Sequence, residues 1–184
     1  TIEELVAAAK EKGNLKASTN GNKASNHTAA QLLAKSAGFK YKAIPYGGTA
    51  DQLLALRQGE VDFTCAKVAD VAKLVKGDKP ELRVLAVFNT KRDPELPNVP
   101  TLGEKGLYPE WYGSARALVA PKGTKPEVIQ YYVEAFKKTM QDPAVIEAHK
   151  KAGMALDFKD NKELGDLIKA QDKFARDVVN DLYK

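Results

Sequence analysis

The residues best suited to ligand chemistry lie in the segment STNGNKASNH, residues 18–27, which has no large aliphatic side chain. Its hydroxyl, amide and backbone N–H groups supply many hydrogen-bond donors, and its glycine allows close approach to the backbone. Two further segments, 46–51 and 64–67, are also small or polar and, like the first, are expected to connect a strand to a helix. In open parallel sheets, ligands bind beyond the carboxyl ends of the strands, where helix N-termini favour negative charge. The three loops therefore predict an anion site, with a carboxylate as the natural ligand.

Ordinary turn and capping chemistry is the alternative explanation for the same residues. Asn22 or Ser25 would cap the following helix, and Gly47-Gly48 would form a turn. His27 falls in the first helical turn, where it could bond a neighbouring loop instead of a ligand. The loops contain neither a dinucleotide-binding fingerprint nor a P-loop.

Catalytic and metal-binding patterns are weak in this sequence. The histidines are His27 and His149, and the second lies on a lysine-rich helix where solvent exposure is the default. Cys65 stands in the apolar run VDFTCAKV, which favours a buried small side chain. A nucleophilic pair of Cys65 with His27 is conceivable, but no local signature supports it. H-x-x-x-H and C-x-x-C spacings are missing, so we predict no catalysis, no cofactor and no metal.

Strands and helices alternate over the first ninety residues and would position these loops. Helical spacing and glycine terminators, such as Gly13 and Gly38, predict helices at 1–13, 25–38, 47–59 and 67–77, with Thr1 as a cap for the first. Short apolar or β-branched runs predict strands at 14–18, 40–46, 60–66 and 81–89. This alternation predicts an α/β fold with a mostly parallel sheet.

The rhythm changes after Asn89. A proline-rich stretch at 90–106 predicts an extended excursion followed by a short helix, and SARALVAP at 114–121 predicts another strand. From residue 122 the chain is expected to be helical to its end, with Thr124 as a possible N-cap and Pro126 in the first turn. Apolar residues share one side of the helix expected at 161–184, which therefore needs a surface to pack against.

Charge and hydropathy exclude some functions. The net charge is +5, but the basic residues are mostly lysines scattered among acids, which argues against a nucleic-acid partner. No apolar run approaches the roughly 20 residues of a spanning helix, and no export signal is visible at Thr1.

Several motifs occur in an order that resembles the solute receptors of tripartite tricarboxylate transporters, also called TctC-like or Bug-type receptors. They are G-x-V-D at 59–62, L-R-x-L-A-V at 82–87, K-R at 91–92, L-P-x-V-P-T at 96–101, E-x-G at 104–106, A-P-x-G-T at 120–124 and D-P at 142–143. The resemblance covers nearly the whole chain. It implies a type II periplasmic-binding-protein lobe in an extracytoplasmic, periplasmic receptor that passes a small organic anion to membrane permease subunits.

The resemblance also implies the ligand-binding positions. By position they are Ser18, Thr19, Gly21, Asn22, Lys23, Ser25, His27, Tyr46, Gly47, Gly48, Thr49 and Lys67. Lys23 stands where the family often has glycine, and both Lys23 and Lys67 would strengthen a preference for anions. Asp51 stands where the family often has a proline, and its carboxylate would bind an amino group of the ligand or cap its own helix.

The family pattern also implies a domain division. Residues 1–121 correspond to the second ligand-binding lobe, and residues 122–184 to helices that normally return to a first lobe, which we expect this chain to lack. The face at 161–184 would then fold back, pair with another copy as a homodimer, or stay mobile. The main rival is an effector-binding domain of a transcription regulator, which shares the two-lobed plan.

Overall fold

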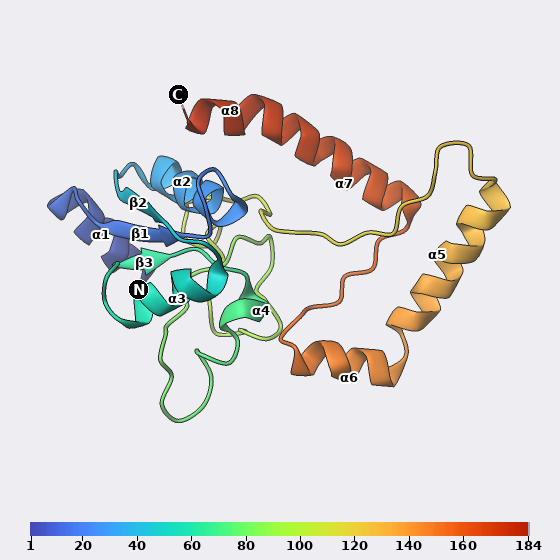
Figure 1. Cartoon of the computed structure of the whole chain (residues 1–184), viewed down its shortest axis with the longest axis horizontal. Coiled ribbons are helices and arrows are strands. Elements are labelled where there is room, and N and C mark those ends of the chain that lie inside the picture. The colour runs from blue at the N-terminus through green and yellow to red at the C-terminus, as the bar shows by residue number, and fades with distance from the viewer. Residues whose placement is uncertain (184) are drawn as a thin grey trace. The chain divides into compact units, whose positions relative to one another are not determined.

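The computed structural model describes residues 1–183 and divides into two compact units, Thr1–Gly113 and Ser114–Lys184. Unit 1 is built on a parallel sheet of three short strands: β1 (Lys16–Thr19), β2 (Lys42–Pro45) and β3 (Phe63–Thr64). The strand order is β2-β1-β3, with β1 in the centre (Figure 1). The predicted α/β class and parallel sheet are confirmed.

Helices alternate with these strands, as the hydrophobic pattern predicted. They are α1 (Ile2–Lys12), α2 (Ser25–Ala37), α3 (Thr49–Arg57) and α4 (Val68–Val71). The Thr1 hydroxyl accepts the Glu4 N–H and closes a capping box, while Gly13 and Gly38 end α1 and α2 in the left-handed conformation. Both glycine terminators and the Thr1 cap were predicted from the sequence.

The core of unit 1 lies between the sheet, α1 and α2. It contains Ala17, Leu33 and Phe39, each less than a tenth exposed, together with Phe63 and Leu102. The rings of Phe39 and Phe63 meet edge to face with their centroids 6.2 Å apart. Burying each large apolar side chain contributes about 1.5–3 kcal/mol, so these contacts fix α1 and α2 on the sheet.

Two predicted elements beyond β3 are wrong or shorter than expected. The helix predicted at 67–77 is limited to α4, because the Leu74 carbonyl accepts the N–H groups of both Glu81 and Leu82 in a turn. The strand predicted at 81–89 is reduced to one parallel bridge between Val87 and Thr101. Its apolar side chains are half-buried against the core, which explains the hydrophobic run without a ladder.

An ion pair closes the proline-rich excursion at 90–106. Arg92 Nε lies 3.0 Å from both carboxylate oxygens of Glu104, and Arg92 Nη1 donates to the Pro97 carbonyl at 3.2 Å. The same carboxylate accepts the Thr101 N–H, and the Thr101 hydroxyl accepts the Glu104 N–H. Hydrogen bonding to Arg92 lowers the pKa of Glu104. The arginine, threonine and glutamate of this motif therefore hold a loop together.

Unit 2 is helical. It contains α5 (Pro126–Met140), α6 (Pro143–Lys151), α7 (Asn161–Phe174), a π-helical turn η1 (Ala175–Val179) and α8 (Asn180–Leu182). Residues 114–121 form no strand, contrary to the prediction, and Lys184 lies outside the described residues. No helix among the described residues is long and apolar enough to cross a membrane.

The start of α5 corrects one prediction, and the helices of unit 2 have exposed apolar faces. Thr124 does not cap α5: its hydroxyl donates to the Pro121 carbonyl at 2.8 Å, and Lys125 takes the N-cap position. Pro126 is at the first helical position, as predicted. No residue of α5, α6 or α7 is buried, and Ile168 on α7 is 56% exposed. The apolar face expected at 161–184 is therefore not covered by other residues of this unit.

Candidate functional site at the carboxyl edge of the sheet

The three predicted loops leave the same edge of the sheet. Because all strands are parallel, their carboxyl ends at Thr19, Pro45 and Thr64 lie along one edge. The Tyr46 N–H donates to the Thr19 carbonyl at 2.9 Å, which ties the second loop directly to the first. The structure therefore brings segments 18–27, 46–51 and 64–67 together, as the predicted parallel sheet required.

Gln52, on α3, joins these loops through a buried hydrogen-bond network. Its side chain is fully buried, and Oε1 accepts Asn26 Nδ2 at 2.8 Å. Its Nε2 donates to the Cys65 carbonyl at 2.8 Å and to the Thr64 hydroxyl. Its backbone carbonyl accepts the Ser18 hydroxyl at 2.9 Å. One side chain thus links β1, α2, α3 and the end of β3.

The sequence analysis missed Gln52 and Asn26. Both are buried polar residues near the starts of α3 and α2. The sequence does carry a signal for Gln52, because it lies next to Leu53 and three residues before Ala55, and both of these are buried on α3. A polar residue on a buried helix face needs internal partners, because an unsatisfied buried amide is costly.

Ser18 and Thr19 support the loop from below. Both side chains are fully buried, and the Thr19 hydroxyl donates to the Gly21 carbonyl at 3.3 Å. Thr64 also donates its hydroxyl to the Ser18 carbonyl at 2.9 Å. In this conformation the hydroxyls of Ser18 and Thr19 shape the loop from inside the protein.

Lys23 and His27 form a strained turn at the start of α2. Lys23 has a φ of 58°, the left-handed region that favours glycine, and it is the one non-glycine residue with positive φ among the described residues. Its N–H donates to His27 Nδ1 at 2.9 Å. Burial lowers the pKa of His27, which keeps the ring neutral and this nitrogen able to accept. A glycine, which the family resemblance leads us to expect at this position, would adopt this φ without a Cβ penalty.

The starts of α2 and α3 at this edge lack side-chain caps, as does the start of α5 in unit 2. The N-cap of α2 is Ala24, not the predicted Asn22 or Ser25, and Ser25 is the first helical residue. The N-cap of α3 is Gly48. No side chain among residues 1–183 caps either helix, whereas Thr1, Asp142 and Asp160 cap α1, α6 and α7. The first N–H groups of α2 and α3 are therefore left without the side-chain acceptors that α1, α6 and α7 have.

The remaining predicted residues lie around these starts. Tyr46 reaches away from the loops, since its hydroxyl lies 3.1 Å from Glu60 Oε2. Desolvation and this hydrogen bond raise the pKa of Tyr46. Lys67 is the exposed N-cap residue of the short helix α4, and Asp51 is exposed in the first turn of α3.

Cys65 is at the same edge, but its environment suppresses reactivity. Burial raises the pKa of its thiol to about 12, so the thiolate is scarce at neutral pH. Its backbone carbonyl accepts from Gln52, which gives the residue a structural role. No cluster of three potential metal ligands occurs within the described part of the chain.

A parallel sheet with uncapped helix starts at its carboxyl edge is an arrangement at which α/β proteins bind ligands. Comparison with known proteins identifies the family. Residues 1–182 match the model of the tripartite tricarboxylate transporter family receptor, TctC, and the chain belongs to this family. The rival interpretation, an effector-binding domain of a transcription regulator, is therefore set aside.

Relatives in sequence support this assignment. The chain is 36% identical over 144 residues to the UPF0065 protein in gbd 5'region of Cupriavidus necator, covering 78% of this chain and 43% of that protein. It is 29% identical over 150 residues to protein BugT of Bordetella pertussis, covering 80% of this chain and 45% of that protein. The chain thus spans about half the length of the curated relatives that it matches.

Solved structures agree on the fold. A TctC solute binding protein from Polaromonas is 27% identical with a TM-score of 0.86, covering 98% of this chain and 62% of that one. The periplasmic binding protein BugD is also 27% identical, with a TM-score of 0.60 over 83% of this chain and 50% of that one. These proteins place the parallel sheet and its helices in the periplasmic-binding-protein fold class.

Proposed function

We propose that the carboxyl edge of the sheet forms one wall of a binding site for a small organic carboxylate, in a receptor that delivers this solute to a membrane transporter. The observation that carries the proposal is the pair of helix starts at Ala24 and Gly48. Both stand at the predicted ligand edge, and neither has the side-chain cap found on α1, α6 and α7.

A carboxylate fits these helix starts for a physical reason. The first backbone N–H groups of a helix lack intrahelical acceptors, and the helix dipole adds about half a positive charge there. A ligand oxygen would take the place of the missing caps on α2 and α3. Exposed lysines at positions 23 and 67 add positive charge on the flanking loops, while Asp51 is the acid among them.

The fully buried residues hold this wall in position. Gln52 fixes the spacing between β1, α2 and α3, so the two helix starts are set before a ligand arrives. Proteins of the same fold have been solved with adipate and with malate bound. We therefore propose a dicarboxylate-sized ligand, held by the backbone N–H groups at the starts of α2 and α3 and by the exposed side chains of Lys23 and Lys67. Ser18, Thr19 and Tyr46, which the family pattern also implied, support the loops or point away from them instead.

Further parts of the proposal follow from the family. The receptor is extracytoplasmic, its partners are the permease subunits of the transporter, and it performs no catalysis. The raised pKa of Cys65 agrees with the last point. Residues 1–121 are proposed as the second ligand-binding lobe and residues 122–184 as helices that pack on a first lobe. Pairing with a second copy through residues 161–183 stays a prediction.

The test is a nuclear magnetic resonance titration of the ¹⁵N-labelled chain with malate and adipate. With one wall of the site present, we expect weak binding, with dissociation constants of about 1 mM or more. The backbone N–H signals of Gly21, Gly48 and the first residues of α2 and α3 should shift. The neutral diamide of adipic acid should leave them unchanged, because it lacks the carboxylates.

A substitution at Gly48 separates the proposed site from general effects. The backbone of Gly48 is extended, with φ of −178°, and a Cβ there would meet nothing within 4 Å. Gly48→Val should therefore fold normally and cover the start of α3, removing the shifts. Gly165→Ala is the matched control, since its Cβ also meets nothing within 4 Å and it lies on α7. Shifts that survive in Gly48→Val, or that occur away from the three loops, would overturn the proposed site.

A further inference from the structure

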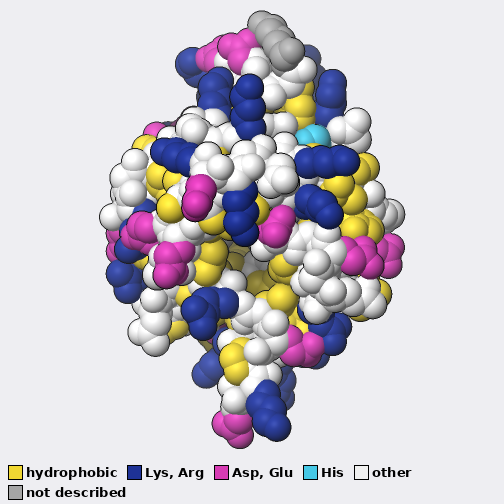
Figure 2. All heavy atoms as spheres, turned by 90° about the vertical axis from the view of Figure 1, so that its left-hand side faces the viewer, with side chains coloured by type: hydrophobic (Ala, Val, Ile, Leu, Met, Phe, Trp, Pro, Cys, Tyr) yellow, Lys and Arg dark blue, Asp and Glu magenta, His cyan; other side chains and the backbone are white. Residues whose placement is uncertain are grey.

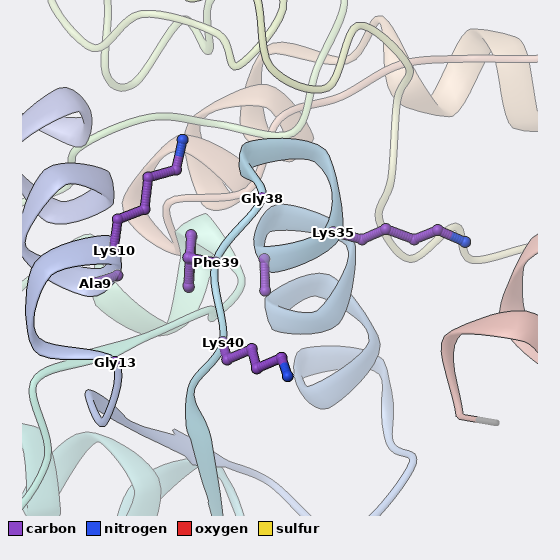
Figure 3. Close-up of a pocket in the computed structure, with 8 residues that line it drawn as sticks. Ala9, Lys10, Gly13, Lys35, Gly38, Phe39 and Lys40 are labelled. Atoms are coloured by element: carbon purple, nitrogen blue, oxygen red, sulfur yellow. The ribbon is translucent and has the colours of Figure 1, made fainter.

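An open pocket lies at the amino edge of the sheet, opposite the proposed carboxylate site. Its volume is about 440 Å³, and it is bounded by the C-terminal ends of α1 and α2. Buried Ala9, Ala34 and Phe39 form its apolar lining, and exposed lysines at positions 10, 35 and 40 form its rim (Figure 3).

Positive charge is concentrated around this pocket. Residues 9–16 and 34–42 contain six lysines, and Glu11 is the one acid among them. None of the six lysines forms an ion pair with another described residue, whereas Lys76, Lys105 and Lys173 elsewhere do. Seen from the side where α1 lies, basic side chains and some acidic ones are interspersed with exposed hydrophobic ones (Figure 2).

Helix stability explains part of this charge but not all of it. Lys10, Lys12 and Lys35 occupy last turns, where a cation complements the helix dipole. Lys16 and Lys42 instead face each other in register as the first residues of β1 and β2. Like charges opposite each other in a sheet repel, and the Asp62 carboxylate, which accepts the Lys16 N–H at 2.7 Å, offsets part of that repulsion. An anionic partner would offset the remainder.

We propose that the amino edge of unit 1 docks an acidic segment of a partner protein that carries an apolar anchor residue. The apolar lining accepts the anchor, and the lysines of the rim face carboxylates on either side of it. Figure 3 shows the side chains of Lys10, Lys35 and Lys40 pointing apart around Phe39, which suits separate carboxylates along a chain better than one small anion.

A second pocket supports an extended occupant. It has a volume of about 300 Å³, also uses Lys10, and is lined by Ile2, Val6 and Leu107, with the Lys105–Glu3 ion pair at its edge. The two pockets therefore adjoin along α1 and offer sites for more than one apolar side chain. Because this surface lies at the edge opposite the ligand loops, the inference stands independently of the proposed carboxylate site.

The test measures fluorescence anisotropy of a short labelled peptide in which glutamates flank a central Leu-Phe pair. The variant Lys10→Glu/Lys35→Glu/Lys40→Glu should bind it about tenfold more weakly or worse, since like charges then face each other across the contact. The matched control Lys122→Glu/Lys137→Glu/Lys138→Glu carries the same change in net charge on exposed lysines of unit 2. The control should lose less than about threefold in affinity, through long-range charge alone.

Further arms test the anchor and the fold. Replacing the Leu-Phe pair of the peptide by serines should also weaken binding about tenfold, since apolar area is no longer buried. If glutamates at the helix ends unfold the first variant, the triple glutamine variant at Lys10, Lys35 and Lys40 replaces it. Equal losses in the two triple glutamate variants would overturn the proposal. So would binding to vesicles containing phosphatidylglycerol without binding to the peptide, which would identify a membrane surface instead.

Discussion

Replacing Gln52 by leucine should destabilise unit 1 by about 3 kcal/mol, because leucine keeps most of the volume but none of the hydrogen bonds. Asn26 Nδ2, in a residue only 5% exposed, loses its acceptor at 2.8 Å. The Cys65 carbonyl loses its donor at 2.8 Å, whereas the Ser18 carbonyl keeps the Thr64 hydroxyl as a donor at 2.9 Å. Each orphaned buried group costs about 1–3 kcal/mol, with the amide of Asn26 dominating because it is more buried than Cys65.

Urea denaturation followed by Trp111 fluorescence measures this loss. The chain has a single tryptophan, and it lies in unit 1, so its signal reports on the unit that contains Gln52. Gln58→Leu is the matched control because the Gln58 side chain is exposed at the end of α3. The control should stay within about 0.5 kcal/mol of the unchanged protein.

A double substitution tests the network itself. Asn26→Ala alone leaves Gln52 Oε1 without its donor, and Gln52→Leu alone leaves Asn26 Nδ2 without its acceptor. The double variant has neither orphan, so its loss should be smaller than the sum of the single losses by about 1 kcal/mol or more. Strict additivity, or a loss below about 1 kcal/mol for Gln52→Leu, would refute the network as the organiser of the three loops.

Three other features make separate predictions. Lys23→Gly should raise the free energy of unfolding by about 0.5 kcal/mol, because relief of the left-handed backbone outweighs the added entropy of the unfolded state. Lys67→Gly, at a residue with φ of −72°, should lower the free energy of unfolding and serves as the control. Urea denaturation midpoints measure both changes, and a loss of stability in Lys23→Gly would contradict backbone strain at this position. In a His149→Gln background, the imidazole signal of His27 should titrate below the ordinary histidine pKa of 6.5, since burial lowers its pKa. The stability that neutral His27 contributes should be fully present above pH 6.5 and be lost as the pH falls through the pKa of the folded state. A titration midpoint at or above 6.5 would contradict this prediction. Cys65 should react slowly with dithiobis-nitrobenzoate at pH 8 in the folded protein and rapidly in urea, because its pKa is raised to about 12; equal rates would show an exposed thiol.

Local features of the sequence predicted much of unit 1. Thr1 and the glycines at 13 and 38 gave the bounds of α1 and the end of α2, because capping depends on residues that are close in sequence. The alternation of elements gave the parallel sheet and hence the grouping of the three loops. Motifs at 82–87 and 91–106 indicated the family, although the first forms no strand and the second is held by Arg92 and Glu104.

The predictions failed where distant partners decide the structure. The apolar run at 81–89 packs against the core without pairing as a strand, which hydrophobicity alone cannot distinguish. Ala24 precedes α2 in place of a polar cap, which a capping rule would not select. Gln52 was overlooked because its partners at 18, 26, 64 and 65 come from three other segments of the chain.

Periodicity, glycine positions and motif order were enough to predict the α/β class, the family and the loops that could meet an anion. Which polar groups face inward depends on packing: Ser18, Thr19 and Gln52 are internal supports, while the helix starts at Ala24 and Gly48 are uncapped. Packing also gathers the lysines of α1, α2 and the strand starts on the opposite edge. The physical reason is that burial and hydrogen bonding between distant segments depend on the packed fold, which no local pattern encodes.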